Sequence, residues 1–114
     1  MKKLFSSSIL FALLVLISSV SYAQKEAVVI RFKVWGNCEM CQKTIESALD
    51  VKGVKSAKWD VKTKMLEVVY VPNKISEDNI HRLVASSGYD TEKVKADDKI
   101  YGDLHECCKY PRKR

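Results

Sequence analysis

Residues 26–41 read EAVVIRFKVWGNCEMC, an alternating pattern that leads into a pair of cysteines. Within this stretch, Ile30, Phe32 and Val34 alternate with basic side chains, which is typical of a strand with one buried face. The glycine that follows the pattern interrupts it. We therefore predict a strand over residues 26–35 and, after it, a short loop that carries both cysteines.

Hydrophobic periodicity predicts five further elements before residue 96. They are a helix over residues 41–51, strands over 54–61 and 65–71, a helix between Ser76 and Gly88, and a weaker strand over 89–95. Ser76 is a good N-cap, and Gly88 supplies the left-handed residue that ends a helix. The order βαββαβ predicts an α+β fold, the ferredoxin-like sandwich, in which an antiparallel sheet carries both helices on one face.

The first 23 residues have the features of a cleaved signal peptide. Lys2 and Lys3 precede an apolar run over residues 9–17, and small residues flank the tyrosine of residues 21–23. The apolar run is shorter than the roughly 20 residues that a membrane span needs. We therefore predict export to the periplasm or secretion, with no stable membrane insertion after cleavage.

The predicted mature chain, residues 24–114, is small and mildly basic. The whole chain of 114 residues has 20 basic and 14 acidic side chains, and two of the basic ones precede the cleavage site, so a net charge of +6 becomes +4. This length excludes a TIM barrel or a dinucleotide-binding enzyme. The mixed charge gives little support for nucleic-acid binding. We predict one domain over residues 24–95 and a charged, irregular tail over residues 96–114.

Cys38 and Cys41 are the strongest chemical signal in the sequence. They lie where the first strand meets the first helix, and there the helix dipole and free N–H groups lower a thiol pKa. Their spacing lets both sulfurs face one point. Thiolates select soft ions. Two of them without further ligands suit copper(I) or mercury(II) better than zinc, which usually takes four ligands.

The sequence WGNCEMC on a βαββαβ chain resembles the heavy-metal-associated domain, the fold of copper chaperones, of metal-binding modules in heavy-metal pumps and of exported mercury-binding proteins. The resemblance covers about residues 26–95. The family motif is Gly-Met-x-Cys-x-x-Cys, and this chain has Trp35 and Gly36 in place of its glycine and methionine. The resemblance also implies that Tyr89, in a Gly-Tyr pair typical of the family, lies near the metal loop.

His105, Cys107 and Cys108 form a second group of ligand-type residues, in the tail. The chain between Lys95 and Cys107 spans roughly 40 Å when extended at about 3.3 Å per residue. If the tail turns back, these residues complete a site of three or four ligands and shift its preference toward zinc or a more buried copper(I). The alternatives are a disulfide from the tail to the loop, or no defined role.

Two other residues bear possible ligand atoms, the Met40 thioether and the His81 imidazole, and metal binding is the less favoured interpretation of each. Met40, between the two cysteines, is expected to point to solvent or to a partner, and His81 is expected on the surface of the second helix.

We predict that the protein is an exported carrier, chaperone or scavenger that binds a soft metal ion. Copper(I) is the favoured ion, and mercury(II) and zinc are the alternatives. The partner of the protein would be a metal-transport or metal-resistance protein. The sequence offers no general base and no cofactor cradle, so we predict no enzymatic activity. The alternative is a thiol–disulfide redox protein that uses the same cysteine pair, although the thioredoxin fold needs a longer chain. In an oxidising compartment the pair could also form a disulfide when metal is absent.

Overall fold

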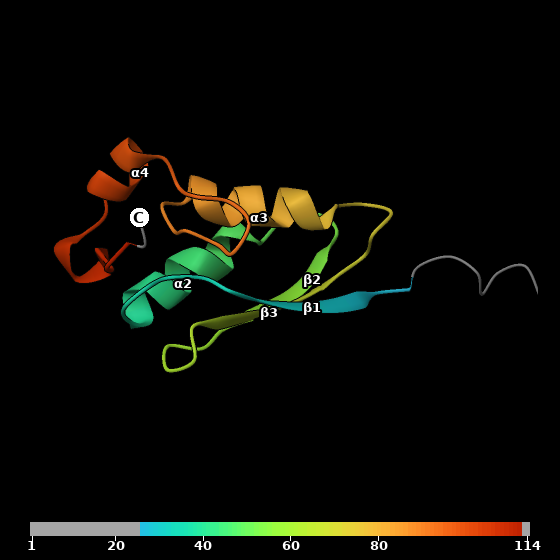
Figure 1. Ribbon diagram of the computed structural model, residues 1–114. Helices are drawn as coiled ribbons and strands as arrows, with labels where there is room; N and C mark the ends of the chain where they lie inside the picture. The colour runs from blue at the N-terminus through green and yellow to red at the C-terminus, as the bar shows by residue number, and fades with distance from the viewer. Residues whose placement is uncertain (1–25, 113–114) are drawn as a thin grey trace, which may run out of the picture.

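The computed structural model describes residues 26–112, and a three-stranded antiparallel sheet covered on one face by two helices forms its centre (Figure 1). The elements are β1 (Val28–Lys33), α2 (Glu39–Ala48), β2 (Val54–Trp59), β3 (Met65–Tyr70), α3 (Glu77–Ser86), α4 (Asp98–Gly102) and the 3₁₀ turn η1 (Glu106–Cys108). The strand order is β1-β3-β2. The predicted signal peptide, residues 1–23, lies outside the described residues.

One row of side chains across the sheet shows why the alternating pattern produces this fold. Phe32 in β1 pairs with Leu66 in β3, and Leu66 pairs with Trp59 in β2. All three are buried, together with Val68 two residues along β3. Burial of each such side chain contributes about 1.5–3 kcal/mol. The row faces the helices, because Phe32 stacks on the ring of His81 in α3.

The two helices begin and end close to the predicted positions. The Ser76 hydroxyl caps α3 by accepting a hydrogen bond from the Asn79 N–H at 3.1 Å, and Gly88 follows the helix at φ +106°. The buried face of α2 includes Cys41 and Ile45. Within residues 26–112, no helix has both the length and the apolar character that crossing a membrane requires.

The predicted fourth strand, residues 89–95, is wrong. Only Thr91 pairs with the sheet, in an isolated antiparallel bridge to Val34. The Thr91 hydroxyl instead accepts hydrogen bonds from the N–H groups two and three residues later, and the Asp90 carboxylate accepts one from the N–H of Ala96. These side chains compete with the strand ladder and turn the chain away from β1.

His81 is buried, so its predicted surface position is wrong. Its side chain is 1% exposed, its ring stacks on Phe32 at 3.8 Å between centroids, and its Nδ1 lies 2.6 Å from the Thr91 hydroxyl. Burial lowers the pKa of the imidazole. His81 therefore belongs to the packing between α3 and the sheet.

The tail is folded rather than irregular. It contains α4 and η1 and runs back along the domain, so that its end lies beside the N-terminal end of α2 (Figure 1). Leu104 packs against Gly88, where a Cβ would lie 2.9 Å from the leucine Cδ2. Any larger residue at Gly88 would push this part of the tail away.

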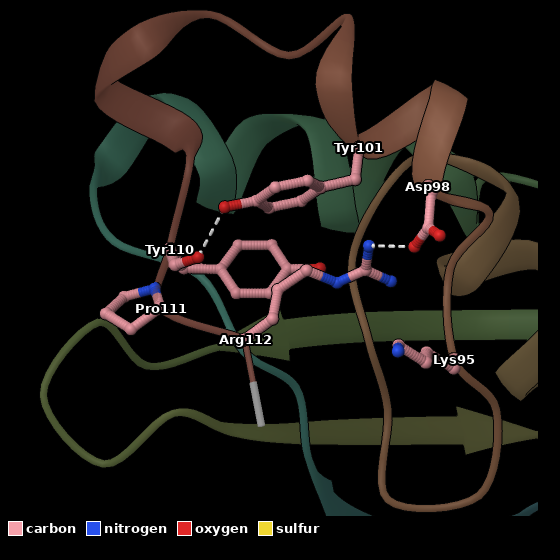
Figure 2. Close-up of a pocket in the computed structure, with 6 residues that line it drawn as sticks. All are labelled: Lys95, Asp98, Tyr101, Tyr110, Pro111 and Arg112. Atoms are coloured by element: carbon pink, nitrogen blue, oxygen red, sulfur yellow. Dashed lines mark hydrogen bonds and ion pairs between the residues drawn. The ribbon is translucent and has the colours of Figure 1, made fainter. Parts of the chain in front are cut away.

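Tyr110 and Arg112 attach the end of the tail to the domain. The Tyr110 hydroxyl donates to the Gly88 carbonyl at 2.9 Å and accepts from the Asp90 N–H at 2.8 Å. The Arg112 guanidinium donates two hydrogen bonds to the Asp90 carboxylate, at 2.9 and 3.0 Å. Figure 2 shows the Arg112 and Tyr110 side chains gathered beside Tyr101, whose ring centroid lies 4.6 Å from the guanidinium carbon. The last described residues of the tail are thus held by directional contacts.

Replacement of Arg112 by Met should lower the free energy of unfolding by about 3 kcal/mol at pH 7, because it leaves a largely buried carboxylate unpaired. The Arg112 and Asp90 side chains are only 12% and 10% exposed. Burial alone would raise the pKa of Asp90, but the hydrogen bonds from Arg112 and Ala96 outweigh it and the pKa is lowered. The ion pair therefore contributes fully at neutral pH, and its contribution falls once the pH drops below about 4.

Chemical denaturation at pH 7 and pH 3 measures both effects. Arg31→Met is the matched control, because the ion pair of Arg31 with Glu67 is exposed and should contribute less than about 1 kcal/mol. Equal losses in the two variants at pH 7 would contradict the role given to Arg112.

Candidate metal centre

The loop between β1 and α2 places both cysteines of the pair at the start of the helix. Cys38 is the N-cap residue of α2, with extended backbone angles of φ −143° and ψ 177°, and Cys41 lies in the first turn. The Asn37 N–H points to the Cys41 sulfur at 3.5 Å. The first turn of the helix thus brings the two side chains to one side of the loop.

The packing around position 36 explains why this chain has glycine there, where the family motif has methionine. A Cβ at this position would lie 3.0 Å from two carbons of the Trp59 ring and 3.4 Å from the Cys41 Cβ. The Trp59 indole N–H donates to the carbonyl oxygens of Val34 and Lys64, which fixes the ring under the loop. Trp59 therefore fills the space that a larger residue at position 36 would need.

A third sulfur joins the pair from the tail. The Cys38 and Cys41 sulfurs are 3.4 Å apart, and the Cys108 sulfur lies 3.9 Å from that of Cys38. All three sulfurs lie within 4.8 Å of one another. Cys41 and Cys108 are buried and Cys38 is partly exposed. All four cysteines of the chain are free thiols.

These separations fit three thiolates around one soft ion. Sulfurs that bind an ion at about 2.3 Å lie about 4.0 Å apart in a trigonal plane and about 4.6 Å apart on a line through the ion. The Cys38–Cys108 separation matches the trigonal value, and the Cys38–Cys41 pair needs to open by about half an ångström. Three soft donors in such an arrangement suit a soft metal ion.

The thiols differ strongly in acidity. The backbone N–H of Cys41 lowers the pKa of the Cys38 thiol to about 7. This agrees with the acidity expected at a helix N-terminus. Burial raises the pKa of the Cys108 thiol to about 12. The free site thus holds one thiol that ionises near neutral pH and one that keeps its proton until a metal displaces it.

Cys38 should be the thiol that reacts fastest with iodoacetamide at pH 7, because it combines partial exposure with a pKa near 7. Its alkylation rate should reach half of its maximum near pH 7, whereas Cys108 should stay unmodified until the protein unfolds. Mass spectrometry of proteolytic fragments after short exposures measures both rates. Faster labelling of Cys108 than of Cys38 in the folded protein would contradict this order.

The other ligand-type residues of the tail lie outside the three-sulfur group. Cys107 is exposed, with its sulfur 3.9 Å from that of Cys108 and 3.9 Å from the Met40 sulfur. His105 is exposed and precedes η1 as its N-terminal cap residue. The structure therefore brings one of the three tail residues, Cys108, to the cysteine pair.

Two tyrosines enclose the buried side of the site. Tyr89, which the family resemblance places near the loop, is fully buried, and its hydroxyl has no hydrogen-bond partner among the described residues. Burial raises its pKa, and the thiols of Cys108 and Cys41 beside it raise the pKa further. Tyr110 stacks on Tyr89 at 5.8 Å between centroids. Tyr110 is not among the residues predicted for the site, although an aromatic residue in so charged a tail is a signal that the tail docks.

Comparison with known proteins supports the same type of site. A sequence model of the heavy-metal-associated domain matches residues 37–90. No curated protein sequence matches the chain. Among solved structures, the CopZ metallochaperone is similar, with 27% identity and a TM-score of 0.54 over 56% of this chain and 98% of that one.

Two further solved structures show the same fold. One is the N-terminal domain of a potential copper-translocating P-type ATPase from Bacillus subtilis in the Cu(I)-loaded state, with 25% identity and a TM-score of 0.56 over 58% of this chain and 85% of that one. The other is oxidized MerP from Ralstonia metallidurans CH34, with 23% identity and a TM-score of 0.56 over 59% of this chain and 96% of that one. With the cysteine loop at the start of α2 and the match over residues 37–90, the chain contains a heavy-metal-associated domain, a metal-ion-binding fold.

Proposed function

We propose that the protein is an exported carrier, chaperone or scavenger of copper(I), which it binds through Cys38, Cys41 and Cys108. The observation that carries this proposal is the grouping of three thiol sulfurs within 4.8 Å of one another at the start of α2. Two of them come from the family motif and the third from the tail. In this proposal the metal ion is cargo, and the protein is not an enzyme.

The number of ligands favours copper(I) over the other soft ions. Zinc in proteins usually takes four ligands, and the described part of the chain brings three cysteines together. Mercury(II) is suited by two thiolates, whereas the third thiolate here adds a donor in a trigonal arrangement that copper(I) accepts. Two of the similar structures, a metallochaperone and a Cu(I)-loaded domain of a P-type ATPase, support the same choice.

Export and a transport partner belong to the same proposal. The signal-peptide features of residues 1–23 support a periplasmic or secreted location. The partial exposure of Cys38 supports transfer by ligand exchange, because a partner's thiol can reach an ion there. A membrane pump or resistance protein with exposed thiols or thioethers is the partner chemistry that fits.

Copper(I) titration of the reduced protein against a competing chromogenic chelator tests this proposal. The unaltered protein should bind one equivalent tightly. The double variant C38S/C41S should bind it at least about 100-fold more weakly, because loss of a residue that only hydrogen-bonds to a metal ligand already costs roughly 10–100-fold. Equal affinity in the two proteins would contradict the proposal.

A thiol–disulfide redox function is the second candidate. The lowered pKa of Cys38 and the 3.4 Å separation from Cys41 favour it, since an acidic thiol beside a second thiol is the arrangement that redox cysteines need. Multiple turnovers in a disulfide reduction assay, together with weak copper(I) affinity, would support this function over metal carriage.

A further inference from the structure

A second group of sulfur atoms lies on the surface beside the three-thiol site. Met40, in the first turn of α2, is 48% exposed. The exposed Cys107 thiol donates toward the Met40 sulfur over 3.9 Å. The Cys107 sulfur also lies 3.9 Å from that of Cys108, which is buried. The pair Met40–Cys107 is therefore in contact with both solvent and the inner site.

Five sulfurs form an unbroken series of contacts from the surface to the core. The steps from Met40 to Cys107, from Cys107 to Cys108 and from Cys108 to Cys38 are each 3.9 Å, and the last step, to Cys41, is 3.4 Å. Two sulfurs that hold one ion at about 2.3 Å with trigonal angles lie about 4.0 Å apart. Each of the first three steps thus has the separation that shared binding of one ion requires.

On the basis of the proposed function, we propose that Met40 Sδ and Cys107 Sγ form a second, outer copper(I) site through which the ion enters and leaves the inner site. A thioether and a thiolate are both soft donors, which suits copper(I). Two donors on an open surface suit zinc poorly, because zinc usually takes four ligands. Cys108 is the residue that the outer and inner sites share.

Movement of the ion between the two sites is a series of ligand exchanges in which copper stays in the +1 state. When copper(I) binds Met40 and Cys107, the Cys107 thiol releases its proton to water. Cys108 then releases its proton and binds the ion as Met40 dissociates. Binding by Cys38 and Cys41 follows, and Cys107 dissociates and takes a proton from water. No electron is transferred, and the protons released in total are those of the inner thiols.

The burial of the inner site explains what the outer site contributes. Cys41 is 0% exposed and Cys108 2%, so Cys38 is the one inner cysteine that is itself partly open to an incoming ligand. An ion on Met40 and Cys107 is open to the thiols of a donor or acceptor. The outer pair should therefore change the rate of transfer much more than the affinity of the inner site.

The test is transfer of copper(I) from the loaded protein to a chromogenic chelator, followed by stopped flow with the reduced protein. Met40→Leu keeps a strong helix-forming residue of similar size and removes the thioether. Its affinity for the first equivalent should stay within about threefold of that of the unaltered protein. Transfer should be slower by about tenfold or more, which is the lower end of the cost of losing a supporting contact at a metal site. Cys107→Ser should have the same effect. Met65→Leu is the matched control, because this methionine lies in β3, and it should transfer copper(I) at the unaltered rate.

A second measurement isolates the outer site at equilibrium. In the C38S/C41S background, a weaker copper(I) equivalent should remain, and Met40→Leu, but not Met65→Leu, should weaken it by about tenfold. Unchanged transfer rates in Met40→Leu and Cys107→Ser, with tight binding of the first equivalent intact, would overturn the outer site and leave the proposed function standing. Failure of the unaltered protein to bind copper(I) tightly would overturn the proposed function and the outer site with it.

Discussion

Replacement of Cys108 by serine should weaken copper(I) binding by at least about 100-fold, because it removes a ligand, and loss of a residue that only hydrogen-bonds to a ligand already costs roughly 10–100-fold. The serine hydroxyl is a hard donor of similar size, so the variant should fold as the unaltered protein does. Competition with a chromogenic chelator measures the affinity, and the melting temperature checks the fold.

The pH dependence gives this prediction an independent readout. The pKa of the Cys108 thiol is raised to about 12, so at pH 7 the thiol is protonated in the free protein and must release its proton when the ion binds. The affinity of the unaltered protein should therefore rise more steeply with pH between 7 and 9 than that of Cys108→Ser, by about one proton. Cys107→Ser, at the adjacent exposed position, is the control and should keep the steep slope. Equal affinities and slopes in Cys108→Ser and the unaltered protein would exclude Cys108 from the site.

Removal of residues 96–114 should have the largest combined effect on stability and binding. It removes the buried Tyr110 and exposes Tyr89 on the other side of their stack, so the free energy of unfolding should fall by at least about 3–5 kcal/mol, the cost of deleting a buried aromatic side chain. Copper(I) affinity should fall to that of Cys108→Ser, because Cys108 is the one tail residue in the inner site.

Denaturation and copper(I) titration of the truncated protein measure the two effects separately. The variant Tyr110→Phe is the control for docking alone, since it removes two hydrogen bonds to the domain and keeps Cys108. A truncated protein that binds copper(I) as tightly as the full chain would show that the tail stabilises the domain without serving the metal.

Most of the central fold could be predicted because its signals are local. The alternation of Ile30, Phe32 and Val34 predicts β1, and Ser76 and Gly88 mark the two ends of α3, where the structure shows a side-chain cap and a positive φ. The fourth strand could not be predicted correctly, because the side chains of Asp90 and Thr91 bind nearby N–H groups and turn the chain. In the same turn, the Thr91 hydroxyl lies 2.6 Å from Nδ1 of His81. The burial of His81 depends on this contact with a distant segment, so the pattern of α3 alone does not predict it.

The candidate site likewise has one part that local sequence signals predict and one part that depends on long-range contacts. Cys38 and Cys41 are brought together by one loop and one helical turn, and their spacing in the sequence is enough to predict this. The approach of the tail depends on contacts between distant residues, chiefly Tyr110 with Gly88 and Arg112 with Asp90, and no local pattern encodes them. Cys107 and Cys108 are neighbours in η1, one exposed and one buried, so only the docked tail distinguishes their roles.

The most direct test of the three-thiolate site is X-ray absorption spectroscopy at the copper edge, with one equivalent of copper(I) bound to the reduced protein. We expect three sulfur neighbours at about 2.3 Å in the unaltered protein and two in Cys108→Ser. A spectrum with two sulfur neighbours that is the same in both proteins would contradict the three-thiolate site.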